Sequence, residues 1–221
     1  MWTHVKVGDK DYDLWAIKGI RQHFVKLLAC DGGPISANLQ VANEWYTDDG
    51  QKVMDETVSI QAFRAGSKGR IVDIALIFKA VSEPVTIDSS ARGYGGINLR
   101  FAPRQETVLT VPNGKLEKDI DRERYVWSDL SAKFGGSSEF SGIAIFDNPD
   151  NPSYPTGWSN RYYGILGPSF TGIEPVTIQP DKPLVVQYRL WIHKGDAESG
   201  AVARAYETYM HPPTVRVKGD K

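Results

Sequence analysis

Aromatic and polar side chains come together in a stretch that could bind a sugar. Trp158, Arg161 and Tyr163 follow a proline-rich segment at 148–155. An aromatic ring can stack on the C–H face of a sugar while a guanidinium group donates hydrogen bonds to its hydroxyls. The prolines restrict φ, which lowers the entropic cost of ordering the segment and predicts a rigid surface loop. The alternative places Trp158 in the core and Arg161 in an outer ion pair, and the segment alone slightly favours it.

A second candidate face lies near the C-terminus. In the segment 184–194, Gln187, Arg189, Trp191 and His193 alternate strictly with apolar residues. Successive side chains of a strand point to opposite sides, so these four are expected to share one face. That face either is solvated or lines a polar cleft, and the segment by itself favours solvation.

A third polar face follows a glycine-rich turn at 92–96. Asn98 and Arg100 alternate there with Ile97 and Leu99. The glycines permit a bulge or a close approach of the backbone. Their spacing is not that of a dinucleotide-binding or phosphate-binding loop, and no helix is expected after them.

Metal and cofactor chemistry find little support. The four histidines lie far apart, without HxH or HExxH spacing. We therefore expect no metal and no cofactor. Cys30 is the one cysteine, which excludes an intramolecular disulfide, and its place in the apolar run 24–30 predicts a buried, inert thiol.

The elements that must position these residues are mostly strands. Apolar residues alternate along 71–80 and 58–62, and the short segment 65–69 between them predicts a hairpin. Helical spacing occurs only from Ala197 to Met210, before two prolines. We therefore predict an all-β, antiparallel β-sandwich with one C-terminal amphipathic helix, and one domain spanning 1–221.

Charge and hydropathy limit the classes of partner. The formal net charge is -1 and no segment is strongly basic, so neither nucleic acid nor a membrane is an expected partner. No run of about 18 apolar residues is present, and the N-terminus has no signal-peptide segment. The chain reads as cytoplasmic, or as periplasmic or secreted if a leader had been removed.

Several segments together resemble one family. They are Tyr12-Asp13-Leu14-Trp15, Asn43-Glu44-Trp45, the segment 93–100, Trp127-Ser128-Asp129, the segment 142–149, Trp158 and the segment 161–164. In this order they resemble the bacterial PmoA-like domain of unknown function, labelled "methane oxygenase PmoA". The resemblance implies a β-sandwich of the type found in sugar mutarotases (a supersandwich) and a role in carbohydrate use. A membrane-bound methane oxygenase would need membrane helices and metal ligands, and the sequence predicts neither.

The resemblance also carries an expectation about the N-terminus. Members of the family have an N-terminal region that ends in a His-Pro-His-His-Arg-like motif before a Trp-Thr-His-like segment. Here Met1-Trp2-Thr3-His4 stands where that motif would end. We therefore expect a chain that lacks the His-rich part and its strands. Loss of those strands would expose a sheet edge, through which a homodimer is expected.

Three functions follow from these observations. The first is a carbohydrate isomerase, hydrolase or lyase, the second a non-catalytic module that binds a sugar or oligosaccharide, and the third a structural or assembly domain. The expected catalytic residues are His193, Arg161 and Glu44. The expected substrate-binding residues are Asn98, Arg100, Trp158, Tyr163, Arg189 and Trp191. Arg100, Trp158, Arg161 and His193 are expected to face one shared cleft.

Overall fold

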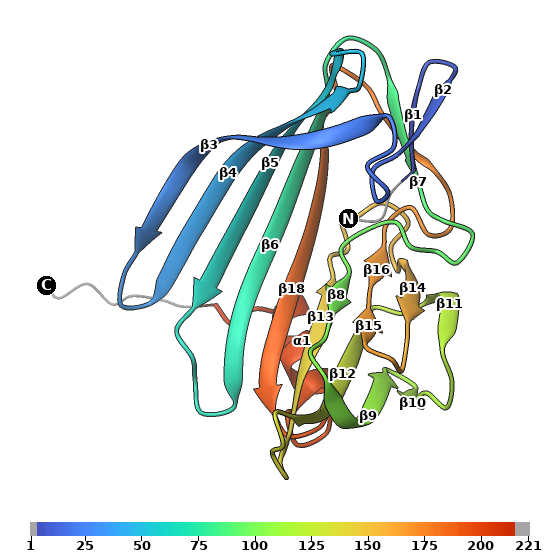
Figure 1. The fold of residues 1–221 in the computed structure, drawn as a ribbon. Coiled ribbons are helices and arrows are strands. Elements are labelled where there is room, and N and C mark those ends of the chain that lie inside the picture. Colours follow the sequence, from blue (N-terminus) through green and yellow to red (C-terminus); the bar gives the residue numbers. More distant parts are fainter. Residues whose placement is uncertain (1–3, 215–221) are drawn as a thin grey trace, which may run out of the picture.

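A computed structural model describes residues 4–214, which form an all-β sandwich with one helix, as predicted (Figure 1). Its main element is a nine-stranded antiparallel sheet of order β10-β9-β12-β13-β18-β6-β5-β4-β3. These strands are β3 (Ile20–Gly32), β4 (Ser36–Thr47), β5 (Lys52–Phe63), β6 (Gly69–Ala80), β9 (Arg104–Val111), β10 (Gly114–Lys115), β12 (Trp127–Phe134), β13 (Phe140–Asp147) and β18 (Leu184–Lys194).

Three smaller sheets complete the strand framework. The first has the order β17-β7-β1-β2, the second β11-β14-β16, and the third pairs β15 with β8. These strands are β1 (His4–Val7), β2 (Lys10–Asp13), β7 (Val85–Asp88), β8 (Leu99–Arg100), β11 (Ile120–Arg124), β14 (Gly157–Asn160), β15 (Ile165–Leu166), β16 (Pro168–Ser169) and β17 (Val176–Ile178). Their apolar side chains pack against one face of the nine-stranded sheet to form the main core.

Alternation along the strands decides which residues enter that core. On β18, Val186, Tyr188 and Leu190 are buried in the main core, and on β6, Leu76 and Phe78 join them. β5 and β6 are adjacent and antiparallel, which confirms the predicted hairpin.

Helix α1 (Val202–Met210) covers part of the opposite face of the large sheet. Its Val202 and Tyr206 pack with Phe146 of β13 and Trp127 of β12 in a second apolar cluster. The helix starts later than predicted, because Ala201 before it has a left-handed backbone with φ 53°. No helix in the range 4–214 is long and apolar enough to cross a membrane.

The far end of the large sheet reaches beyond the smaller sheets, and β3 forms its outer edge (Figure 1). Eight consecutive residues of β3, 21–28, are exposed. Phe24 is 66% exposed and Leu27 52%, although both are large and apolar. The prediction that Cys30 is buried is therefore wrong: the apolar run that suggested burial lies on this edge strand, where Cys30 is exposed.

Two adjacent valines of β18 allow a test of which side chains of this strand face the core. Val186 is fully buried in the core and Val185 on the other face is 42% exposed. We predict that Val186→Ala lowers the free energy of unfolding by about 2 kcal/mol, since it removes buried methyl groups and leaves a cavity. Val185→Ala should cost less than about 1 kcal/mol. Urea denaturation of both variants measures the difference, and equal losses would contradict this assignment of the two faces.

Candidate functional site

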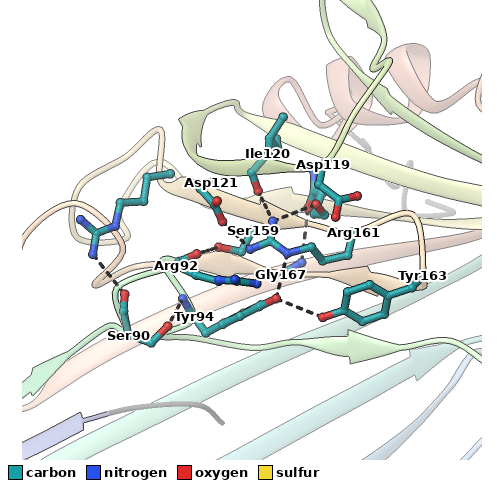
Figure 2. A network of polar contacts seen from close by, with 12 residues as sticks. Ser90, Arg92, Tyr94, Asp119, Ile120, Asp121, Ser159, Arg161, Tyr163 and Gly167 are labelled. Carbon is teal, nitrogen blue, oxygen red and sulfur yellow. Dashed lines mark hydrogen bonds and ion pairs between the residues drawn. The ribbon is translucent and has the colours of Figure 1, made fainter.

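Arg161 lies in a hydrogen-bonded network just after β14 (Figure 2). Its Nε donates to the Tyr94 hydroxyl over 2.9 Å, and its guanidinium lies 5.1 Å from the centre of the Tyr94 ring. The two Nη atoms donate to the backbone carbonyls of Ile120 and Asn160 and to the carboxylate of Asp121. Because Arg161 is only 3% exposed and its guanidinium bonds to the protein, it connects parts of the fold here rather than facing an open cleft.

The other residues predicted to contact a sugar near this network do not line a shared cleft either. Trp158 is fully buried in the main core and its Nε1 donates to the Tyr125 carbonyl over 2.7 Å. Its ring therefore cannot stack on a sugar in this structure. Tyr163 is exposed and its hydroxyl lies 3.1 Å from that of Tyr94. Arg100 is exposed on β8, while Asn98 donates to a nearby backbone carbonyl over 3.2 Å.

His193 forms a buried pair with Asp129. His193 Nε2 lies 2.7 Å from Asp129 Oδ2, and neither side chain is exposed. Ser131 Oγ donates to the other carboxylate oxygen over 2.5 Å. Burial raises the pKa of Asp129 above its usual range, because the charged form loses its hydration.

Two glycines leave the space that the His193 ring occupies. A Cβ at Gly142 would lie 2.8 Å from His193 Cε1, and a Cβ at Gly200 would lie 2.1 Å from His193 Nδ1. Any larger residue at either position would collide with the ring. The histidine is thus enclosed between β13 and the turn before α1.

Glu44 and Trp191 also have protein partners. Glu44 accepts hydrogen bonds from Lys52 and from the Tyr46 hydroxyl, and these bonds hold its pKa below the usual range. Trp191 packs in the cluster under α1 and donates to the Gly200 carbonyl over 2.9 Å.

The structure does not bring Arg100, Trp158, Arg161 and His193 to one open cleft. The last three are buried in different parts of the molecule, Trp158 in the main core and His193 against Asp129, whereas Arg100 is exposed. The aromatic and polar residue types of the Trp158 stretch suggested a sugar-binding surface. Trp158 of β14 instead packs in the main core, as the alternative interpretation of that stretch predicted.

A groove of ≈ 500 Å³ lies on the large sheet, on the same face as α1. It crosses β3, β4, β5, β6 and β18 and is bordered by Asn148 and Tyr209. Two neighbouring rows of side chains cross these strands in register. The first row is Ala29, Gln40, Ser59, Ala75 and Gln187, and the second is Asp31, Asn38, Gln61, Asp73 and Arg189. We call this surface, with its two bordering residues, the polar groove.

Small side chains make the first row hollow. Ala75 and Ser59 separate Gln187 from Gln40, so the centre of the row is low and its flanks carry amides. Gln40 Nε2 donates to Ser59 Oγ over 2.9 Å. An amide both donates and accepts, as a hydroxyl does, so this row matches a ligand rich in hydroxyl groups.

One ion pair closes the β18 side of the groove. Arg189 makes two bonds of 2.6 Å to the carboxylate of Asp73, and its guanidinium lies 4.7 Å from the centre of the Tyr209 ring. Asn148 Nδ2 donates to the Tyr209 hydroxyl over 2.6 Å. The Arg189 charge is thus neutralised within the groove, and an aromatic face and an amide lie beside it.

The loop after β13 is fastened to the groove through Asn151. Its side-chain amide donates to the Gln187 carbonyl over 2.6 Å and accepts from the Gln187 N–H over 2.7 Å. The same amide donates to Asp147 Oδ1 over 2.8 Å, and the Thr156 N–H donates to Asp147 Oδ2 over 2.9 Å. Burial raises the pKa of Asp147 from its ordinary value of 3.8 to about 6. One buried carboxyl therefore organises the loop that carries Asn148.

The sequence held the signal for only part of this groove. Of its residues, only Arg189 was predicted as a site residue, and the shared face of Gln187, Arg189, Trp191 and His193 is confirmed. α1 covers the Trp191 end of that face and leaves the Gln187 end in the groove. The polar residues that alternate with the apolar positions of β4 and β5 were missed, namely Asn38, Gln40, Ser59 and Gln61. Only the register between strands shows that they line up.

The polar groove contains few ionisable side chains. The side chains of the polar groove that can ionise are Asp31, Asp73, Arg189 and Tyr209, and Asp31 accepts a hydrogen bond from Asn38 at the β3 edge. Asp73 and Arg189 are paired, and burial raises the pKa of the Tyr209 hydroxyl. Within residues 4–214, no group of three or more His, Cys, Asp or Glu side chains is placed to hold a metal ion.

These features define the protein as a β-sandwich with an open polar groove on the outer face of its large sheet. The chain belongs to a family of unknown function, DUF6807, whose match covers residues 1–207. That match does not test the PmoA-like label or the expected His-rich N-terminal part. None of the curated proteins matches the chain.

A solved structure shares the fold. It is described as "Putative kojibiose phosphorylase from human microbiome", with a TM-score of 0.53 and 8% sequence identity. The alignment covers 96% of this chain and 25% of that one, so the chain spans a quarter of that protein. At this identity the likeness concerns the fold alone.

The buried carboxyl of Asp147 predicts a pH dependence of stability. Its folded-state pKa is raised to about 6, so the folded protein keeps a proton that the unfolded chain loses near pH 4. This contribution is complete below about pH 4 and is lost as the pH rises through 6. Compared with Asp147→Asn, the wild type should lose about 2–3 kcal/mol of unfolding free energy between pH 4 and pH 7. Urea denaturation measures the free energy of unfolding of both proteins at each pH. If the two free energies change with pH in parallel, the pKa of Asp147 is not raised in the folded protein.

Proposed function

We propose that the protein is a carbohydrate-binding module whose ligand lies in the polar groove. The observation that carries the proposal is the pair of polar rows, in which side-chain amide and hydroxyl groups line a hollow above small side chains. Such groups form hydrogen bonds in both directions, as the hydroxyls of a sugar require. The sandwich fold shared with the structure described as "Putative kojibiose phosphorylase from human microbiome" is consistent with this role.

The groove favours binding over catalysis. A glycoside-cleaving or isomerising enzyme needs an acid and a base whose pKa values fit the reaction. Among the predicted catalytic residues, His193 and Arg161 are buried with protein partners, and Glu44 is paired with Lys52. Arg189 keeps its predicted role as a sugar contact, and Asn38, Gln40, Gln61 and Gln187 are added to it. Glu44 lies on the same face, four residues along β4 from Gln40.

A substitution that fills the floor of the groove with a larger side chain tests the proposal. Ala75→Leu would place a bulky side chain between Ser59 and Gln187 without removing a polar group. A neutral oligosaccharide that binds the native state should raise the melting temperature of the wild type. We predict that Ala75→Leu loses this shift, while Ala102→Leu, the same change at an exposed position outside the groove, keeps it.

A thermal-shift screen against neutral and acidic saccharides makes the measurement. The melting temperature of each unliganded variant shows whether it is folded. If folded wild-type protein gives no shift with any saccharide, or if Ala75→Leu shifts as the wild type does, the groove is not a sugar site.

A second candidate function is self-assembly, and the exposed edge β3 favours it. The strand offers unpaired backbone groups along 13 residues together with the exposed Phe24 and Leu27. In an antiparallel pairing of two copies that aligns His23 near the start of β3 with Asp31 at its end in the other copy, Leu27 aligns with its own counterpart. The occupant of this edge is therefore a second copy of the chain, in a closed two-fold dimer.

A lysine on the apolar side of β3 tests this assembly. We predict a dimer in multi-angle light scattering, and a monomer for Leu27→Lys at the same concentration, because two lysines would face each other across the new pair. Gln105→Lys, at an exposed position of β9, should stay dimeric. Wild-type protein that is monomeric at every concentration tested excludes the second candidate.

A further inference from the structure

The polar groove is closed at one end and open at the other. At β18, the Tyr209 ring lies over Arg189, and Asn148 is bonded to Tyr209. Beyond this point, α1 packs on Phe146 of the next strand and occupies the face. At the opposite end the groove reaches Ala29 on β3, which is the edge of the sheet. A ligand can therefore extend past β3 but not past α1.

The contacts along the groove repeat once per strand. Neighbouring strands are about 4.8 Å apart, so the five strands present a row about 19 Å long. Each strand adds one side chain to each row, and most of these are amides, hydroxyls or carboxylates. A ligand that repeats hydroxyl groups along its length matches this arrangement better than a single compact sugar does.

The charge of the groove selects for a neutral ligand. Its one lining cation, Arg189, is held by two bonds to Asp73. The one further charged row member is the Asp31 carboxylate at the β3 edge, which accepts a hydrogen bond from Asn38 over 2.9 Å, and the remaining row members, such as Gln61 and Gln187, are uncharged. A phosphate or uronate would have to displace Asp73 to reach the guanidinium, and it would add a second negative charge beside that carboxylate.

The closed end is also the more rigid end. Asn151 binds both backbone groups of Gln187, and the buried Asp147 holds Asn151. At the open end, β3 carries register shifts at Val25 and Leu28 and is exposed. A preformed site costs less ordering entropy on binding, so the first sugar unit should gain most of its affinity at the closed end.

We propose that the polar groove binds the terminus of a linear, neutral oligosaccharide, with the end unit against α1 and the chain leaving across β3. This inference rests on the proposed function and adds the ligand's length, charge and direction. Gln187 contacts the end unit, and Gln40 contacts a unit further along the chain.

The experiment is isothermal titration calorimetry with linear gluco-oligosaccharides of one to six units, in the α-1,4 and the β-1,4 series. Affinity should rise with each added unit until the chain passes β3 and should then level off. A cyclic gluco-oligosaccharide, which has no end to place against α1, should bind at least about tenfold more weakly than the linear chain.

Two glutamines of the same row provide a matched pair of variants. Gln187→Ala, at the closed end, should weaken binding of every length about five- to tenfold. Gln40→Ala, at the open end, should weaken only the longer chains by that factor. Gln105→Ala, at an exposed position of β9 away from the groove, is the control and should bind as the wild type does.

The outcomes separate the two proposals. If no linear oligosaccharide binds and the wild type is folded, the proposed function fails and the inference fails with it. If oligosaccharides bind but both glutamine variants weaken all lengths equally, or the cyclic sugar binds as tightly, binding stands and end recognition is overturned. Tighter binding of acidic than of neutral chains would overturn the inferred charge of the ligand.

Discussion

Alternation along the long strands is the constraint on which the rest of the structure depends. Because successive residues point to opposite faces, each strand of the large sheet supplies one row to the core and one to the other side. On β18 the row of Val186, Tyr188 and Leu190 fixes the strand against the smaller sheets. The same register then places Gln187 and Arg189 beside their partners on β6. A slip of one residue would exchange the two faces and remove both the core and the polar groove.

The second requirement is that the outer face be divided between a covered and an open part. α1 takes the part over β12 and β13, where Phe146 and Trp127 need burial. The part over β4, β5 and β6 carries amides and small residues and stays open. The loop after β13 lies at the boundary, held by Asp147 and Asn151. The border of the groove is therefore set by the same packing that fixes the helix.

The sequence predicted the class of fold well and the site only in part. Period-two patterns such as Leu76 and Phe78 depend on local burial, so they indicated the strands, the hairpin and the sandwich. Trp158 and Arg161 were predicted as sugar contacts, although the segment alone slightly favoured a core position for Trp158, because residue type does not show whether a side chain faces the core or the solvent. The groove depends on register between strands far apart in the chain, as between Asp73 and Arg189, and no local pattern contains that information. Cys30 was misassigned for a related reason, since an apolar run does not reveal that its strand lies at an edge.

The space around His193 links three positions as sequences diverge. Gly142 and Gly200 each leave room that the imidazole ring fills, from two sides of the same residue. A change from glycine at either position requires that the ring first be replaced by something smaller, which would leave the Asp129 carboxylate without that partner. Ser131 Oγ, 2.6 Å from a Cβ at Gly142, and the Asp196 carbonyl, 2.8 Å from a Cβ at Gly200, would then have to shift as well. Substitution at these sites is therefore ordered in time: position 193, with position 129, has to change before 142 or 200 can. Relatives that keep the histidine should therefore keep both glycines.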